Sequence, residues 1–223
     1  MEIQQSVNSE PRKRGRPVKS ADDASAKIRK AALSAFARAG FSGVSVMEIA
    51  QIAGVAKPLV HYHYASKDAL WVAAVEEAIA DLHREMLLTQ QAIASFESPV
   101  ALLRRFSAQL VFFAARHPEL VRIVLAETGQ GGPRSQWLDE HFLLPSYALS
   151  RLIIEKLSAE LKLGADAPRP EHVVPAVLGL MHFPFLEADT LQKAYGTDVY
   201  SEAYLQRHGE MLFNVFIAMF RMV

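Results

Sequence analysis

Residues 45–64, SVMEIAQIAGVAKPLVHYHY, hold two short helical patterns separated by one glycine, and this arrangement limits the folds open to the chain. Ser45 followed three residues later by Glu48 is a capping box, which starts a short helix. Gly54 ends that helix, because glycine adopts the positive φ of a tight turn at little cost. Pro58 lies in the first turn of the next helix, where its missing N–H matters least. The pattern fits a helix-turn-helix or an ordinary helical hairpin.

The second helix favours the helix-turn-helix. Val60 and Tyr64 are its obvious candidates for burial, whereas its other side chains do not form a core-facing set. The polar members are a cation, two imidazoles and a phenol, which suit contact with phosphates and base edges: Lys57, His61, His63 and Tyr62. In a helix-turn-helix, the second helix protrudes to enter a DNA major groove.

The rest of the sequence also predicts helices. Apolar residues recur at steps of three and four from residue 22 to Gly40 and again after Ser66, and no segment alternates as a strand does. Prolines and glycines separate the later helices. We expect a kink at Pro145 within a helix over 134–162, and an irregular helix over 171–190 that contains Pro175 and Pro184. The predicted fold is all-α, with about nine helices in total.

The segment SVMEIAQIAGVAKPLVHYHYASKDALW resembles the DNA-binding signature of TetR-like (tetracycline-repressor-like) transcriptional regulators. The resemblance covers residues 24–75 and includes FARAGFSGVSV and the Ile-Ala-x-x-Ala-Gly-Val turn. It implies an N-terminal three-helix helix-turn-helix domain followed by a helical ligand-binding and dimerisation domain. It also implies that Tyr64 packs between the DNA-binding helices and the fourth helix. The resemblance assigns phosphate contacts to Ser45, Lys57, Tyr62, His63 and Lys67, and base-edge contacts to Pro58, Leu59 and His61.

Position 58 departs from the family pattern, which often has Gly, Ser or Thr there. Pro58 cannot donate a backbone hydrogen bond to a phosphate. Leu59 offers only apolar contact, for example with a thymine methyl group. Direct readout is therefore expected to depend mainly on Lys57 and His61.

A strongly basic segment, RKRGRPVKS at residues 12–20, precedes the first helical pattern. Residues 1–67 carry eleven Lys and Arg against five Asp and Glu, a net charge of +6, while the whole chain is neutral. Arg14-Gly15-Arg16-Pro17 is similar to the core of an AT-hook, which lies in a narrow minor groove. Arg12, Lys13, Arg14 and Arg16 are therefore predicted DNA contacts. The alternative is a solvated basic tail.

We predict three parts: a flexible arm over 1–20, a DNA-binding domain over 21–67, and a body over 68–223 that dimerises and binds a small molecule. Apolar and aromatic residues with a few polar groups typically line ligand cavities. The cavity candidates are Phe106, Leu110, Phe113, Trp137, Phe142, Tyr147, His182 and Phe183. Two helices that are apolar around much of their circumference provide the dimer-interface candidates, which are Val173, Val177, Leu180, Met181, Leu212, Val215, Phe216 and Met219. Packing within one subunit is the alternative for both sets.

Other functional classes find little support. The chain has no cysteine, which excludes disulfides and thiolate chemistry. Its histidines lack zinc-site spacing, and no catalytic or nucleotide-binding motif is present, so we expect no metal, no cofactor and no enzymatic activity. Without an apolar run of about 18 residues or a signal-peptide core, we expect a cytoplasmic protein with no membrane partner.

The predicted function is sequence-specific DNA binding that regulates transcription. We expect a homodimeric repressor on a palindromic double-stranded operator, released by an unknown, largely apolar small-molecule effector. A ligand that favours a subunit arrangement with wrongly spaced recognition helices must lower DNA affinity. The alternative is an architectural DNA-binding protein that has no ligand.

Overall fold

The computed structural model describes residues 19–94, 98–164 and 167–221, and within these ranges every regular element is a helix. The predicted all-α fold is confirmed. The basic-arm residues Arg12, Lys13, Arg14 and Arg16 lie outside the described residues. The helices are α1 (Lys19–Ala39), α2 (Val46–Ala53), α3 (Lys57–His63), α4 (Lys67–Ala94), α5 (Pro99–Arg116), α6 (Pro118–Thr128), α7 (Pro133–Leu138), the π-helix η1 (Asp139–Leu143), α8 (Leu144–Glu160), α9 (Pro170–Leu186), α10 (Ala188–Tyr195) and α11 (Glu202–Arg221).

Local signals in the sequence determine the α2–α3 unit. The Ser45 hydroxyl caps α2 by accepting from the backbone N–H of Glu48 at 3.1 Å. The Glu48 carboxylate does not complete the expected capping box, because it accepts from Arg38 of α1 at 2.8 Å. Gly54 ends α2 in the left-handed region with φ 67°, a conformation that disfavours any residue with a Cβ. The turn therefore fixes how α3 leaves α2.

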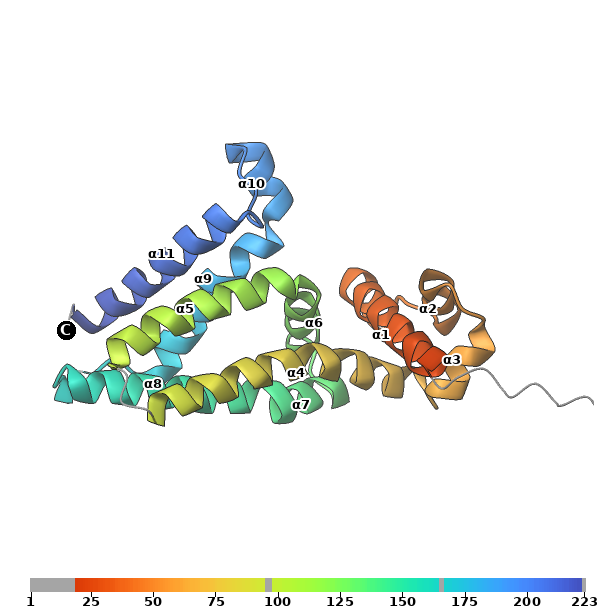
Figure 1. Cartoon of the computed structure of the whole chain (residues 1–223), viewed down its shortest axis with the longest axis horizontal. Helices are drawn as coiled ribbons and strands as arrows, with labels where there is room; N and C mark the ends of the chain where they lie inside the picture. The colour runs from red at the N-terminus through yellow and green to blue at the C-terminus, as the bar shows by residue number, and fades with distance from the viewer. Residues whose placement is uncertain (1–18, 95–97, 165–166, 222–223) are drawn as a thin grey trace, which may run out of the picture.

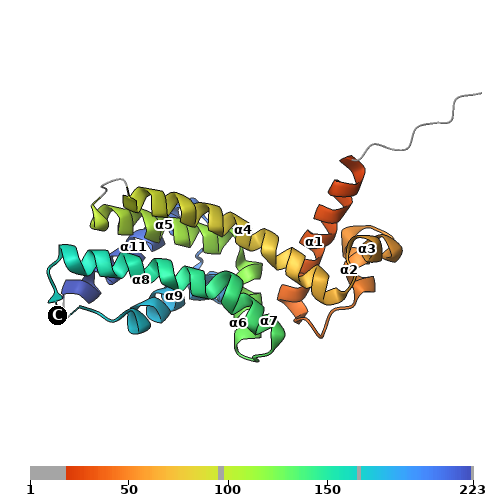
Figure 2. The same ribbon diagram turned by 90° about the horizontal axis from the view of Figure 1, so that it is seen from below.

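Helix α4 connects the small N-terminal cluster to the body (Figure 1). The cluster of α1, α2 and α3 packs around buried apolar side chains, including Ile28, Phe36, Ile49 and Val60. The Ser66 hydroxyl starts α4 by accepting from the backbone N–H of Ala69. From there α4 runs alongside α5, as both views show (Figures 1 and 2).

The body is a bundle in which α5 packs closely against α11. A Cβ added at Gly209 of α11 would lie 3.1 Å from the Cα of Ala108 in α5, so the glycine allows the two backbones to approach. Helix α6 crosses this bundle near the N-terminal cluster (Figure 1) and contacts α1, α4, α5, α7 and α9. The body and the N-terminal cluster therefore meet at α6 as well as through α4.

Prolines shape two segments differently from the sequence prediction. The expected single helix over 134–162 is divided into α7, η1 and α8, with the π-helical turn directly before Pro145. Pro145 has no N–H to donate to a carbonyl one turn earlier, and a wider turn accommodates this loss. The helix expected to reach residue 190 ends at Leu186, soon after Pro184. Pro184 cannot donate to the Leu180 carbonyl, and the His208 imidazole of α11 bonds that oxygen instead, at 3.0 Å.

Candidate functional site

Helix α3 presents a polar face to solvent. Lys57, Pro58 and His61 are exposed, and Tyr62 keeps 79% of its surface accessible. Val60, on the opposite side, is buried against the other N-terminal helices. The structure thus brings these DNA-contact candidates together on the outer face of the second helix of the turn. Contact with DNA itself remains a prediction.

Four other DNA-contact candidates are partly engaged within the protein. Leu59 is half-buried. His63 is also half-buried, its Nε2 has no hydrogen-bond partner, and its ring meets Tyr62 edge-on. The ammonium of Lys67 lies 4.3 Å from the centre of the Phe41 ring, a cation–π contact. Ser45 is exposed, but its oxygen already caps α2.

Tyr64 links α3 to α1 and, through α1, to α4. Its hydroxyl lies 2.8 Å from the Ser25 hydroxyl and accepts from Arg29 at 3.2 Å. Arg29 also forms an ion pair with Glu77 of α4 at 2.7 Å, and this bond raises the pKa of the guanidinium. The network fixes the end of the recognition helix against both neighbouring helices.

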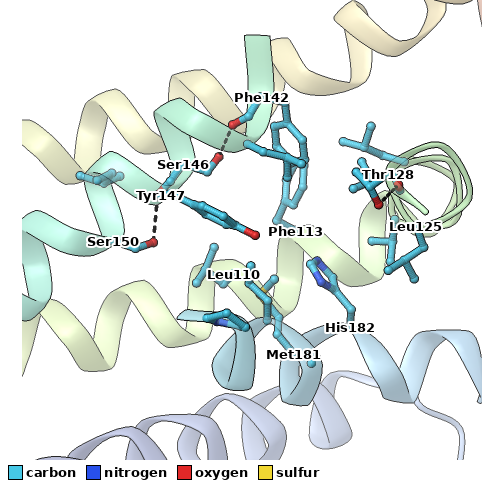
Figure 3. A pocket seen from close by; sticks show the side chains of 18 of the residues that line it. Leu110, Phe113, Leu125, Thr128, Phe142, Ser146, Tyr147, Ser150, Met181 and His182 are labelled. Carbon is cyan, nitrogen blue, oxygen red and sulfur yellow. Dashed lines mark hydrogen bonds between the residues drawn. The ribbon is translucent and has the colours of Figure 1, made fainter. Parts of the chain in front are cut away.

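The body contains a cavity of about 720 Å³ between α5, α6, η1, α8 and α9 (Figure 3). Most of the predicted cavity residues line it, namely Phe106, Leu110, Phe113, Phe142, Tyr147, His182 and Phe183. Leu144 and Phe183 remain 61% exposed, so part of the apolar lining faces solvent. Whether these residues bind a ligand stays a prediction.

The prediction for Trp137 was wrong in its placement. Trp137 is not part of the cavity lining; it packs edge-on against the buried Trp71 and stacks on His141. Trp137 lies in α7, ahead of the π-helical turn, where it packs on Trp71 of α4. The sequence prediction also missed α6, which contributes Leu120, Val121, Val124, Leu125 and Thr128. The spacing of these apolar residues along α6 is equally typical of ordinary core packing, so the sequence did not distinguish a cavity wall from a core.

His182 is the nitrogen-bearing side chain in the cavity wall. Burial lowers its pKa to about 4, while a hydrogen bond to the Leu178 carbonyl opposes the shift. The imidazole is therefore neutral at pH 7. Three wall hydroxyls donate to backbone carbonyls four residues earlier in the chain: Thr128 to Val124, Ser146 to Phe142, and Ser150 to Ser146.

Arg134 joins the body to the DNA-binding cluster. Its Nε donates to the Glu127 carboxylate of α6 at 3.0 Å, and Glu127 is only 5% exposed. The guanidinium carbon lies 3.8 Å from the centre of the Phe41 ring in the α1–α2 connection. A weaker contact of 3.5 Å reaches Asp68 at the start of α4. We name Arg134 with these three partners the Arg134 clamp; the sequence analysis did not foresee it.

The predicted dimer residues largely belong to the subunit core. Val173, Val177, Met181, Leu212 and Phe216 are buried within the single chain, so they are not available to a partner. Their faces of α9 and α11 pack against α5 and each other. Among the predicted residues, Leu180 is exposed, and Val215 and Met219 are half-buried.

Within the described ranges, no group of three or more His, Asp or Glu side chains is arranged to hold a metal ion. No helix in the same part of the chain is long and apolar enough to cross a membrane.

Comparisons with known proteins match both the sequence and the fold. Residues 28–74 match the family described as bacterial regulatory proteins, tetR family. The chain is 28% identical over 116 residues to the HTH-type transcriptional repressor NicS of Pseudomonas putida, covering 52% of this chain and 53% of NicS. It is 30% identical over 106 residues to the HTH-type transcriptional regulator RutR of Escherichia coli, covering 48% of each chain. The matches thus span about half the length of these curated relatives.

Solved structures extend the likeness to the body. The transcriptional regulator FadR of Bacillus subtilis, in complex with stearoyl-CoA, superposes with a TM-score of 0.63 at 13% identity, over 87% of this chain and 98% of FadR. HlyIIR, a hemolysin II transcriptional regulator, gives a TM-score of 0.63 at 18% identity, over 86% of this chain and 98% of HlyIIR. These likenesses concern the fold. The likeness to the tetR family is carried by residues 28–74, and beyond them the chain is similar to these regulators in fold.

Proposed function

We propose that this protein is a homodimeric transcriptional repressor that releases DNA when a small molecule enters the body cavity. The observation that carries the proposal is the exposed polar face of α3, where Lys57, His61 and Tyr62 meet solvent rather than the core. The names of NicS, a transcriptional repressor, and RutR, a transcriptional regulator, support it.

In this proposal α3 enters the major groove. Lys57 and His61 contact phosphates and base edges, while Tyr62 and Lys67 hold the backbone of the duplex. Pro58 and Leu59 provide only apolar contact, so a small number of polar side chains discriminates between bases. Specificity is therefore expected to fall sharply when Lys57 or His61 is removed.

The basic arm adds affinity in the same proposal. Arg14 and Arg16 enter the minor groove beside the segment that α3 reads, and Arg12 and Lys13 neutralise phosphates. Removal of residues 1–18 is then expected to weaken binding and to make it less sensitive to salt. Unchanged affinity and selectivity after this truncation would contradict a role for the arm.

A second copy of the chain pairs across the outer faces of α9 and α11. Exposed apolar side chains there, Leu180 and Met211, together with the half-buried Val215 and Met219, support this arrangement. A four-helix bundle built from two helices of each subunit sets the distance between two recognition helices. Analytical ultracentrifugation is expected to give a dimer, and a Leu180→Glu, Met211→Glu variant is expected to give monomers.

The effector occupies the body cavity. Its volume of about 720 Å³ lies within the usual range for small-molecule sites, and its lining is mostly apolar. FadR, which shares the fold, is described in complex with stearoyl-CoA, so a helical body of this kind can hold a small molecule. The side chains that line this chain's own cavity determine which chemical class of effector it binds.

Selection from random duplexes, followed by fluorescence anisotropy with the purified full chain, tests the proposal. We expect the selected duplexes to share a twofold-symmetric site and to bind at least about tenfold more tightly than scrambled duplexes. Lys57→Ala is expected to weaken binding, whereas Lys156→Ala, on an exposed face of α8, is the matched control. Equal binding to all duplexes would instead favour an architectural DNA-binding protein.

A further inference from the structure

Among the described residues that line the body cavity there is no lysine or arginine. The one carboxylate in this described lining belongs to Asp139 of η1. A carboxylate or phosphate group on a ligand would therefore lose water without gaining a cationic partner, which is costly in an apolar site. The cavity disfavours anions.

The wall hydroxyls offer acceptors rather than donors. Thr128 and Ser146 each donate to a carbonyl of the preceding helical turn at 2.7 Å, and Ser150 does the same at 2.9 Å. Figure 3 shows these bonds running into the helix backbone. Because each hydroxyl has a single hydrogen, a ligand can approach these oxygens only as a donor.

His182 and Tyr147 provide the specific polar contact. The His182 ring is neutral, and its N–H is used by the Leu178 carbonyl, so the other ring nitrogen is an acceptor. The Tyr147 phenol both donates and accepts. Figure 3 shows the Tyr147 hydroxyl and the His182 ring pointing toward each other across the cavity. A ligand hydroxyl between them can donate to His182 and accept from Tyr147, whereas an ether cannot donate to His182. An ammonium can donate to both, but it loses its hydration in a mostly apolar cavity, which is costly.

The rest of the lining describes the remainder of the ligand. Phe106, Phe113, Phe142 and Phe183 contribute aromatic rings from three elements of the wall. Aromatic side chains favour stacked or edge-on contact with ligand rings. A cavity of about 720 Å³ has room for more than a single ring.

We infer that the effector is a neutral, mainly apolar compound of two or more rings whose hydroxyl group lies between His182 and Tyr147. This inference depends on the proposed function, in which the body cavity is the effector site. It names the class of effector: a phenol or alcohol, and neither an organic acid nor an acyl-phosphate ester.

Four probes of one shape test the class by isothermal titration calorimetry with the full chain. They are 4-hydroxybiphenyl, 4-methoxybiphenyl, biphenyl-4-carboxylate and 4-phenylbenzylammonium. We expect 4-hydroxybiphenyl to bind about tenfold more tightly than each of the others, since the ether and the carboxylate cannot donate to His182 and the ammonium loses its hydration in an apolar site. Binding of the carboxylate, the ether or the ammonium as tightly as the phenol would overturn the inference, and so would failure of all four to bind.

Variants locate the hydroxyl contact. His182→Phe keeps an apolar ring but removes the acceptor, and Tyr147→Phe removes only the phenolic oxygen. His182→Phe is expected to reduce the preference for the hydroxyl over the methoxy probe to about twofold, because only the bond donated to His182 distinguishes the two probes. Tyr147→Phe is expected to weaken both probes by a similar factor and to keep the preference, because both accept from the phenol. His172→Phe, on the exposed face of the same helix and outside the lining, is expected to retain both affinities and the full preference. An unchanged preference in His182→Phe, or unchanged affinities in Tyr147→Phe, would contradict the assigned contacts.

Operator binding without any probe separates this inference from the proposed function. If the protein binds a symmetric DNA site but prefers the carboxylate probe, the regulator assignment stands and the effector class is wrong. If the protein binds no DNA selectively but prefers the hydroxyl probe, the ligand class stands and the regulatory role is wrong.

Discussion

Replacing Arg134 with Met is expected to lower the free energy of unfolding by about 3.5–4 kcal/mol. The substitution keeps the apolar part of the side chain but removes the guanidinium that bonds the buried Glu127 carboxylate at 3.0 Å. Breaking a fully buried ion pair costs about 3–5 kcal/mol. The Arg134 side chain keeps 26% of its surface exposed, which places the expected loss at the lower end. The lost cation–π contact with Phe41 adds about 0.5–1 kcal/mol, and the exposed Asp68 adds little.

A second substitution tests the reason for this loss. Glu127→Gln combined with Arg134→Met removes the unpaired buried charge, so the double variant is expected to be more stable than Arg134→Met alone, with a loss of about 1 kcal/mol. Arg104→Met is the matched control. Arg104 also pairs with a carboxylate, that of Glu210, and lies over the Phe213 ring, but both charged groups are about half exposed. Its loss should stay below about 1 kcal/mol.

Urea unfolding followed by circular dichroism at the helical band measures all of these variants. The reasoning would be refuted if Arg134→Met cost no more than Arg104→Met. It would also be refuted if the double variant were less stable than Arg134→Met. Either result would mean that Glu127 is not a desolvated carboxylate that depends on Arg134.

Three further predictions concern the turn, the DNA contact and the cavity. Gly54→Ala is expected to cost about 1–2 kcal/mol in urea unfolding, because its φ of 67° strains an L residue although the added Cβ meets no atom within 4 Å. Lys57→Ala should reduce the salt dependence of operator binding, measured by anisotropy, by about one unit of slope, as one phosphate contact is lost. Stability should fall as the pH drops from about 6.5 to about 4, because the unfolded chain takes up a proton that folded His182, with its lowered pKa of about 4, does not. This slope, at most about 1.4 kcal/mol per pH unit, should be absent from His182→Phe and should therefore appear in the difference between wild type and the variant across a pH series of unfolding curves.

The sequence predicted the DNA-binding unit well because its signals are local. Ser45, Gly54 and Pro58 each act within one helical turn, so their effects do not depend on distant parts of the chain. The exposure of Lys57 and His61 follows from the same short pattern. The cavity candidates on α5 and α9 also lie in the cavity lining. Aromatic side chains on facing helices of a small helical body point into the space between those helices.

Features that depend on tertiary packing were harder to predict. Apolar residues on α9 and α11 show that these faces need to be covered, but not whether the cover is another helix of the same subunit or a second copy. Val177 and Phe216 turned inward, whereas Leu180 stayed exposed. The Arg134 clamp joins residues that are 7 and 66 positions apart, with nothing in the local sequence to pair them.

Helix α6 provides a physical connection between the cavity and the DNA-binding cluster. Leu125 and Thr128 line the cavity, while Glu127 holds Arg134, which lies over Phe41 beside α1. A ligand that displaces α6 outward must therefore also shift the contacts that hold the cluster. By linkage, DNA that fixes the cluster must weaken ligand binding by the same factor, typically about 1–3 kcal/mol of coupling. If Arg134→Met binds both DNA and ligand, but neither changes the affinity for the other, the coupling passes through the Arg134 clamp. If the effect is retained, it passes instead along α4.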